Sequence, residues 1–324
     1  MSRQTSRGTA TIAQLCEALG LTRQAYYAAK TRTIESEETT AEADFDPAQE
    51  SSRVAIVEPA GSCEADSGSE IPERPEVSSR WLSAAALVAA IRRVVARFPA
   101  WGVRKVWAYL RRAGQRASRK RVWKTMQALG LTLPPIRERA VPLRPGHVAV
   151  PESNRRWATD LTTTWTAREG WVALVPVIDC GDRFVFEIEV TKSQQAWDVL
   201  VPVERSLLAC FGDPRAVPEG LELRSDHGPQ YTGSDCEKLC ETWKVEHTFA
   251  PVGRPTGNAV VERFIQTLKV ELLWTRDWES LDEVREAVRE WLPSYNHERP
   301  HQALDWKTPN EKRQENLGRE RLAA

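Results

Sequence analysis

Residues 157–165 read Trp-Ala-Thr-Asp-Leu-Thr-Thr-Thr-Trp, and the expected fold follows from this stretch. Its β-branched and aromatic residues are typical of a strand, and two similar stretches follow, separated by a Cys-Gly-Asp turn. Strands are expected at 157–165, 171–179, 183–190, 221–225 and 245–249, and helices at 194–211, 234–243, 258–273 and 281–291. Three antiparallel-looking strands followed by alternating helices and strands predict an α/β domain, with a mixed five-stranded sheet and helices on both faces.

Three acidic residues lie where such a domain would place a site. Asp160 falls inside the first strand, where a charge is unfavourable for strand formation unless a function compensates. Asp226 comes as the strand at 221–225 ends, just before a Gly-Pro turn, and such strand ends carry sites in α/β sheets. Glu262 lies in the early turns of a helix that Asn258 is expected to N-cap. Carboxylates in these positions are the ligands that a pair of divalent metal ions requires for phosphodiester chemistry.

The net charge of zero conceals a segregation of charges along the chain. Residues 80–150 hold about 16 Lys and Arg against one acidic residue, whereas residues 35–79 hold about 13 acidic residues against two basic ones. A local surplus near +15 favours phosphate contact over a merely solvated face. The acidic segment has too few apolar residues to build a core, so it is expected to be a disordered linker.

Helical patterns in the basic region predict three helices whose basic side chains contact phosphate groups. Helices are expected at 84–98, 102–113 and 118–129, each with an apolar stripe facing inward. Their outward basic side chains are the DNA-contact candidates Arg104, Lys105, Arg119, Lys120, Arg121 and Lys124. A shorter pair of helices over 11–30 also has helix-turn-helix geometry, with an α-hairpin packed on a neighbour as the alternative.

These patterns divide the chain into six segments. They are a helix-turn-helix segment (1–34), an acidic disordered linker (35–80), the basic helix-turn-helix domain (81–133), a Pro-rich linker (134–153), the α/β domain (154–312) and a C-terminal tail (313–324). No apolar run is long enough to span a membrane, the start lacks a secretory pattern, and the six cysteines form no Cys-x-x-Cys pair. We therefore expect a cytoplasmic protein.

The motifs around the three carboxylates, taken as a set, resemble a known family. They are Trp157-Ala-Thr-Asp160-Leu-Thr, Ser225-Asp226-His-Gly-Pro-Gln-Tyr231-Thr, Gly257-Asn-Ala-Val-Val-Glu262, Leu268-Lys269-Val-Glu271 and Tyr295-Asn296-His297-Glu-Arg299-Pro300-His301-Gln-Ala-Leu304. Residues 155–312 are similar to the retroviral-integrase-type catalytic core, and most closely resemble the second-frame transposases of the IS-three group of bacterial insertion sequences. Residues 84–131 are similar to the helix-turn-helix of that family.

This resemblance implies an RNase H-like fold and a catalytic triad of Asp160, Asp226 and Glu262, which would hold two Mg²⁺ ions or, in their place, Mn²⁺. It also implies that Lys269 contacts DNA. The activity implied is that of a DNA transposase, which nicks the ends of its element and transfers the 3′-OH strand. Its partners would be double-stranded DNA (terminal inverted repeats and target DNA), further copies of the chain and an upstream-frame protein, in a bacterial, nucleoid-associated setting.

Some features depart from the family pattern or leave alternatives open. His227 follows the second aspartate of the motifs, where family members often have a basic or small residue. The acidic insertion at 35–79 is also unusual for the family. Asp179, in contrast, matches an aspartate that recurs in the family, and we interpret it as structural. A zinc site at Cys236, Cys240 and His247 is set aside because a clear fourth ligand is lacking. The alternatives are a catalytically inactive or recruited sequence-specific DNA-binding protein, and an RNase H-type nuclease, which leaves the basic region unexplained.

Overall fold

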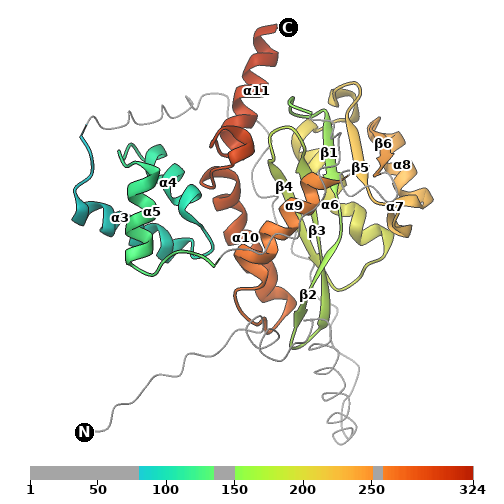
Figure 1. The fold of residues 1–324 in the computed structure, drawn as a ribbon. Coiled ribbons are helices and arrows are strands. Elements are labelled where there is room, and N and C mark those ends of the chain that lie inside the picture. Colours follow the sequence, from blue (N-terminus) through green and yellow to red (C-terminus); the bar gives the residue numbers. More distant parts are fainter. Residues whose placement is uncertain (1–79, 135–149, 251–257, 324) are drawn as a thin grey trace, which may run out of the picture.

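The computed structural model describes residues 80–134, 150–250 and 258–323. The segment expected at 1–34 lies outside these residues, as do nearly all of the acidic linker and most of the Pro-rich linker. Figure 1 shows a group of three helices (α3–α5) beside α10 and α11, with the sheet on the other side of these two helices. Within the described parts of the chain, no helix has the length and apolar character needed to cross a membrane.

The three helices of the basic region form where their apolar stripes predict them. They are α3 (Ala84–Arg97), α4 (Val103–Arg112) and α5 (Arg119–Ala128). Ser83 and Ser118 cap α3 and α5, because their hydroxyls accept hydrogen bonds from backbone N–H groups of the first turn. Their shared core contains the buried side chains Leu87, Ile91, Val106, Val122 and Met126. The apolar stripe predicts Trp123 to point inward, but it is 45% exposed, since it lies about 100° around the helix from the buried Val122.

Six strands form one mixed sheet in the order β2-β3-β1-β5-β6, with β4 also paired to β3. They are β1 (Arg156–Thr159), β2 (Thr162–Thr166), β3 (Gly170–Asp179), β4 (Val185–Thr191), β5 (Glu222–Ser225) and β6 (Glu246–Phe249). Strands β1, β2 and β4 run antiparallel to β3, whereas β5 is parallel to both β1 and β6. The predicted mixed sheet is therefore confirmed.

The single strand expected at 157–165 is two strands, and the break falls at Asp160. Thr159 pairs with Val177 and Thr162 pairs with Leu174, so β1 and β2 follow one register along β3. Continued across the break, this register sets Asp160 opposite Pro176, which has no N–H to donate to the ladder. The sheet has six strands rather than five because the pairing is interrupted at the first candidate carboxylate.

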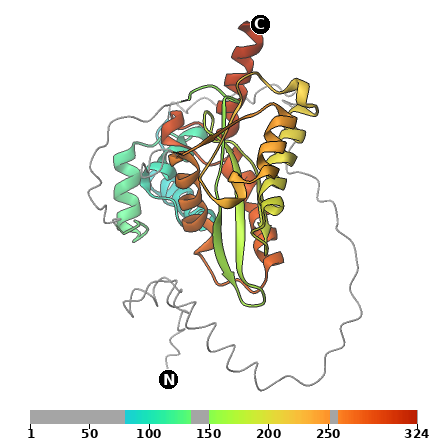
Figure 2. The ribbon, with the colours of Figure 1, turned by 90° about the vertical axis from the view of Figure 1, so that its right-hand side faces the viewer.

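Helices cover both faces of the sheet, as Figure 2 shows. On one face lie α6 (Ala196–Phe211), the short α7 (Pro229–Thr232) and α8 (Ser234–Trp243), and on the other lie α9 (Ala259–Leu268) and α10 (Leu281–His297). The first core takes Trp157, Val175 and Val177 from the strands, and the second takes Ala158, Leu174 and Ile178. Neighbouring strand residues enter opposite cores because successive side chains of a strand point to opposite faces.

The C-terminal part of the chain is more helical than its sequence pattern predicts. The helix expected at 258–273 is α9 followed by a π-helical turn (Lys269–Leu273), in which the Trp274 N–H donates to the Lys269 carbonyl. Helix α10 continues past 291 to His297, despite Pro293 inside it. The tail expected from 313 belongs to a further helix, α11 (Pro309–Ala323).

Helix α11 is anchored by one buried arginine, Arg313, which is 4% exposed. Its guanidinium donates to Asp182 at 3.0 Å and to Asp179 at 3.3 Å, and it lies over the ring of Phe186. Asp179 also accepts backbone hydrogen bonds from Asn154 and Gly181, each at 2.7 Å. Burial and the nearby Asp182 raise the pKa of Asp179 to about 7, against the opposing effect of Arg313. These contacts agree with a structural role for Asp179.

Candidate active site

Two of the three candidate carboxylates lie at the ends of neighbouring parallel strands. Strands β1 and β5 are in register, with Trp157 opposite Leu223 and Ala158 opposite Arg224. Carried two residues further, the same register sets Asp160 level with Asp226. Because adjacent strands are about 4.8 Å apart, their side chains emerge beside each other at this edge of the sheet.

Glu262 approaches the same point from the helix that covers this face. Ala158 lies in the core beneath α9, so Asp160, two residues along, faces the side that α9 covers. Glu262 is in the first turn of α9. Burial raises the pKa of Asp160 to about 6, with further increases from Asp226 and Glu262 and an opposing effect from Lys269. We call Asp160, Asp226 and Glu262 the carboxylate cluster, since the charges of the other two act on Asp160.

The elements that carry the carboxylate cluster are tied together through Thr159. The Thr159 hydroxyl lies 3.3 Å from the Tyr231 hydroxyl of α7, the helix that follows Asp226. The Thr159 carbonyl accepts a hydrogen bond of 3.2 Å from the Asn258 side chain. Asn258 is the N-cap residue of its helix, as predicted, but its side-chain amide is directed to β1 and makes no capping hydrogen bond. Its other side-chain atom, Oδ1, is buried without a partner among the described residues.

Asp226 is held by a tight local turn. Its Oδ1 accepts a hydrogen bond of 2.9 Å from the Gly228 N–H, and its carbonyl accepts one from the Ser225 hydroxyl. A Cβ atom at position 228 would lie 2.9 Å from that carboxylate oxygen, closer than real Cβ contacts. The glycine of the Asp-His-Gly-Pro motif therefore leaves room for the carboxylate.

The donor set of the carboxylate cluster fits a hard divalent cation. Three carboxylates supply oxygen ligands alone, which is the preference of Mg²⁺ and Mn²⁺. Burial and, to a smaller extent, the neighbouring carboxylates raise the pKa of Asp160, and a bound cation would lower it again, since an opposite charge nearby favours the ionised form. Together, three acidic side chains on two strand ends and one helix can hold and polarise a phosphate group through such a cation.

The basic side chains predicted to contact DNA differ in their surroundings. Arg119, Lys120 and Lys124 are exposed on α5. Lys269 begins the π-helical turn beside the carboxylate cluster. The others make contacts within the protein: Arg104 with Gln302, Lys105 with Glu271, and Arg121 with the carbonyl of Leu82.

A buried ion-pair cluster that sequence reasoning missed joins the helical domain to the α/β domain. The Glu271 carboxylate receives Lys105 at 2.6 Å and Arg299 at 2.9 Å, and Trp101 donates to it at 3.3 Å. Burial alone would raise the pKa of Glu271, but the two cations hold it below its usual value. The motifs Leu-Lys-Val-Glu and Glu-Arg-Pro-His carry the sequence signal for this cluster, because they contain Glu271 and Arg299.

Replacing Asp160 by Asn is expected to stabilise the metal-free protein at pH 8. The folded state raises the pKa of this carboxyl above its unfolded value, so its ionised form costs free energy above about pH 6. The gain should be on the order of 1–3 kcal/mol at pH 8 and should vanish as the pH falls towards 4, where wild-type Asp160 is protonated. Denaturant unfolding with a chelator, at both pH values, measures it. Asp277→Asn, at an exposed loop position, is the control. An equal gain in unfolding free energy in this control would contradict the attribution of the effect to the buried carboxyl of Asp160.

Three family models match the described domains. An HTH-like domain model matches residues 83–139, and two integrase core domain models match residues 150–255 and 243–309. The transposase InsD of insertion element IS2A/D/F/H/I/K from Escherichia coli is 28% identical over 236 residues, covering 68% of this chain and 76% of the relative. The IS2-9 form of InsD from strain K12 is also 28% identical, with 68% and 74% covered.

Solved structures of viral integrases are similar to the chain at lower identity. The simian T-cell lymphotropic virus intasome in complex with PP2A regulatory subunit B56 gamma has 16% identity and a TM-score of 0.43, covering 69% of this chain and 74% of that one. The catalytic core domain of BIV integrase has 22% identity and a TM-score of 0.38, covering 52% and 98%. The chain thus carries an HTH-like domain followed by an integrase core domain, and it is homologous to the InsD transposases of insertion element IS2.

Proposed function

We propose that this protein is a DNA transposase that nicks the ends of its insertion element and transfers the 3′-OH strand to target DNA. The observation that carries the proposal is that Asp160 and Asp226 follow the ends of neighbouring strands and that the charge of Glu262, on α9, acts on Asp160, within a chain homologous to transposases. The HTH-like domain supports it, because nicking at a defined end requires a module that binds DNA.

The carboxylate cluster would hold two Mg²⁺ ions, with Asp160, Asp226 and Glu262 as the protein ligands. Such ions lower the pKa of the attacking water or 3′-hydroxyl and stabilise the leaving oxygen, and Mn²⁺ serves the same purpose. The protein's own contribution is to orient the three carboxylates: Thr159 links their elements, and Gly228 fixes the Asp226 carboxylate. Lys269, beside Asp160, would contact a DNA phosphate next to the scissile bond.

Double-stranded DNA is the proposed partner of both domains. The exposed lysine and arginine side chains of α5 would bind the terminal inverted repeat, while the carboxylate cluster would act on the element end and on the target DNA. Bringing two element ends together requires at least two copies of the chain, so we propose a homo-oligomer on DNA. An upstream-frame protein would be a further partner, and cutting that begins only when this protein is added would identify it.

The proposed function is tested with a labelled duplex that carries the element's own terminus. We expect 3′-OH formation that requires Mg²⁺ or Mn²⁺ and is absent with a chelator. Acidification below about pH 6 should weaken metal binding, because a protonated Asp160 cannot ligate a cation. Binding of the terminus without cutting, at any metal concentration, would instead favour a recruited DNA-binding protein.

Replacing Arg119, Lys120 and Lys124 together by Ala is expected to weaken DNA binding and to flatten its salt dependence. For every phosphate that the variant no longer neutralises, the slope of log affinity against log salt should fall by about one unit. Fluorescence anisotropy across a salt series measures both quantities. The control is the double variant Lys192→Ala with Lys238→Ala, which changes two exposed lysines of the α/β domain. An unchanged salt slope in the α5 variant would show that its three basic side chains do not contact DNA phosphates.

A further inference from the structure

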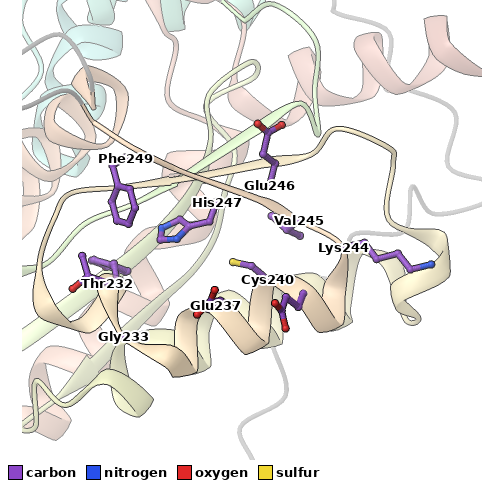
Figure 3. Close-up of a pocket in the computed structure, with 11 residues that line it drawn as sticks. Thr232, Gly233, Glu237, Cys240, Lys244, Val245, Glu246, His247 and Phe249 are labelled. Carbon is purple, nitrogen blue, oxygen red and sulfur yellow. The ribbon is translucent and has the colours of Figure 1, made fainter.

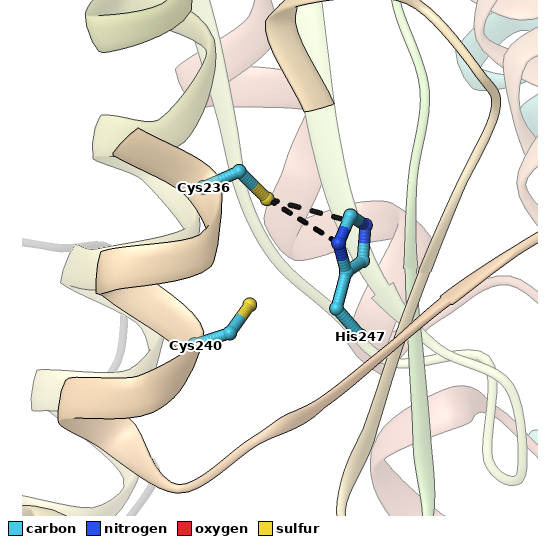
Figure 4. A group of neighbouring side chains, drawn as sticks. All are labelled: Cys236, Cys240 and His247. Carbon is cyan, nitrogen blue, oxygen red and sulfur yellow. Dashed lines mark hydrogen bonds between the residues drawn. The ribbon is translucent and has the colours of Figure 1, made fainter. Parts of the chain in front are cut away.

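Two cysteines and a histidine meet behind the strand end that carries Asp226. Cys236 and Cys240 lie four residues apart on α8, so both face the same side of the helix. Lys244 ends α8 in the left-handed conformation (φ 55°), which reverses the chain into β6 and brings His247 over the two sulfurs. Figure 4 shows both thiols directed towards the imidazole ring.

The spacing of the three ligand atoms matches that of a tetrahedral metal site. The two sulfurs and the ring nitrogen lie within 4.8 Å of one another, and Cys236 Sγ is 3.7 Å from His247 Nδ1. Zn–S bonds of about 2.3 Å and Zn–N bonds of about 2.0 Å, at tetrahedral angles, place neighbouring ligand atoms roughly 3.5–3.8 Å apart. Among the described residues this is the one group of three potential ligands that is gathered so closely.

One ring nitrogen of His247 has a hydrogen-bond partner away from the cysteines. Its Nε2 lies 3.0 Å from the hydroxyl of Ser225, and that hydroxyl donates to the carbonyl of Asp226. Ser225 Oγ can therefore accept the Nε2–H, which leaves Nδ1 unprotonated; Nδ1 is also the ring nitrogen nearer to Cys236 Sγ, at 3.7 Å against 4.0 Å for Nε2. A partner on the second ring nitrogen is typical of metal-bound histidine. The same contact connects this cluster to the turn that holds Asp226.

A fourth coordination position has room. Cys240 and His247 line an open pocket of about 740 Å³, together with Glu237, Glu241 and Lys244 (Figure 3). Cys236 is fully buried below it. The fourth ligand, which the sequence alone does not provide, would be a water molecule from the pocket, as at zinc sites with three protein ligands and an open position.

We propose that Cys236, Cys240 and His247 form a Zn²⁺ site, with a water molecule as fourth ligand, that braces the Asp226 turn from behind. Two thiolates and one imidazole select zinc over Mg²⁺, which the carboxylate cluster prefers. The two metal sites therefore differ in ligand chemistry and can be loaded separately. The zinc site does not depend on the proposed transposase activity.

The test is a Co²⁺ titration of the full chain, free of any histidine tag, reduced, and kept in excess Mg²⁺ so that oxygen sites are filled. We expect a thiolate-to-metal charge-transfer band and the intense visible bands of four-coordinate cobalt, saturating at about one equivalent and displaced by Zn²⁺. Cys240→Ser and His247→Gln should lose the four-coordinate spectrum. Cys180→Ser, a buried thiol in the other core, and Glu262→Gln should keep it.

Absence of the charge-transfer band in the wild type, or its persistence in Cys240→Ser, would overturn the zinc site. A second measurement covers variants that fail to fold. Alkylation of Cys240 in the wild type, followed by mass spectrometry, should slow roughly tenfold when free Zn²⁺ exceeds its dissociation constant about tenfold, and should be unchanged by Mg²⁺. Equal alkylation with and without Zn²⁺ would show that the thiols bind no metal.

Discussion

Glu262→Gln is expected to abolish strand cleavage while leaving binding of the element end nearly intact. The amide keeps the size of the side chain but removes one anionic ligand from the carboxylate cluster. A metal ion contributes several kcal/mol of transition-state stabilisation, so the loss should reach at least about 100-fold in the nicking rate. Single-turnover nicking of the labelled terminus in Mg²⁺ measures it, and Asp226→Asn should behave in the same way.

The matched control is Glu290→Gln, at an exposed glutamate of α10. It makes the same chemical change outside the carboxylate cluster and should leave the nicking rate unchanged. End binding of all variants, measured in parallel, separates a chemical defect from a binding defect. A Glu262→Gln protein that cuts at the wild-type rate would remove Glu262 from the proposed triad.

Arg313→Met is expected to be the most destabilising single substitution considered for this fold. It keeps much of the side-chain volume but removes the cation that lies against Asp179 and Asp182, both of which have fully buried side chains. Removing one partner of a buried ion pair costs about 3–5 kcal/mol, because the remaining charge stays buried. The loss in unfolding free energy should be greatest at alkaline pH and should shrink as the pH falls through 7, since protonation discharges Asp179.

Arg319→Met is the control, because Arg319 lies on the same helix but is exposed and pairs with Glu315 at the surface. Its loss should cost less than about 1 kcal/mol. Adding Asp182→Asn to Arg313→Met should recover part of the stability by removing one of the two unpaired charges. Equal unfolding midpoints for the two arginine variants would show that α11 is not anchored through Arg313.

Elements whose signal is local can be predicted from the sequence. The helices of the basic region have apolar stripes and serine caps, and the strands carry dense runs of β-branched residues, so their expected and observed bounds lie close together. The positions of the three candidate carboxylates can also be predicted from the sequence. A charge inside a strand, one at a strand end and one on a helix are unusual enough to be noticed without coordinates.

Other elements cannot be predicted from the sequence, because they depend on contacts with residues far along the chain. The break at Asp160 depends on Pro176 across the sheet, and the side-chain direction of Asn258 depends on the carbonyl of Thr159. Helix α11 has a mostly polar sequence, which predicts a tail, because the ion pairs of Arg313 that anchor it are invisible in a local pattern.

The class of this protein can therefore be read from its sequence: the order of helices and strands, the basic helical domain and the carboxylate-bearing motifs. Which side chains act together depends on the tertiary structure. It sets Asp160 level with Asp226, encloses Glu271 between two cations of different domains, and brings His247 over Cys236 and Cys240. The periodicity of a sequence indicates on which face of a helix or strand a residue lies. Which of these faces contact each other is decided by packing and by ion pairs between buried residues that are far apart in the chain.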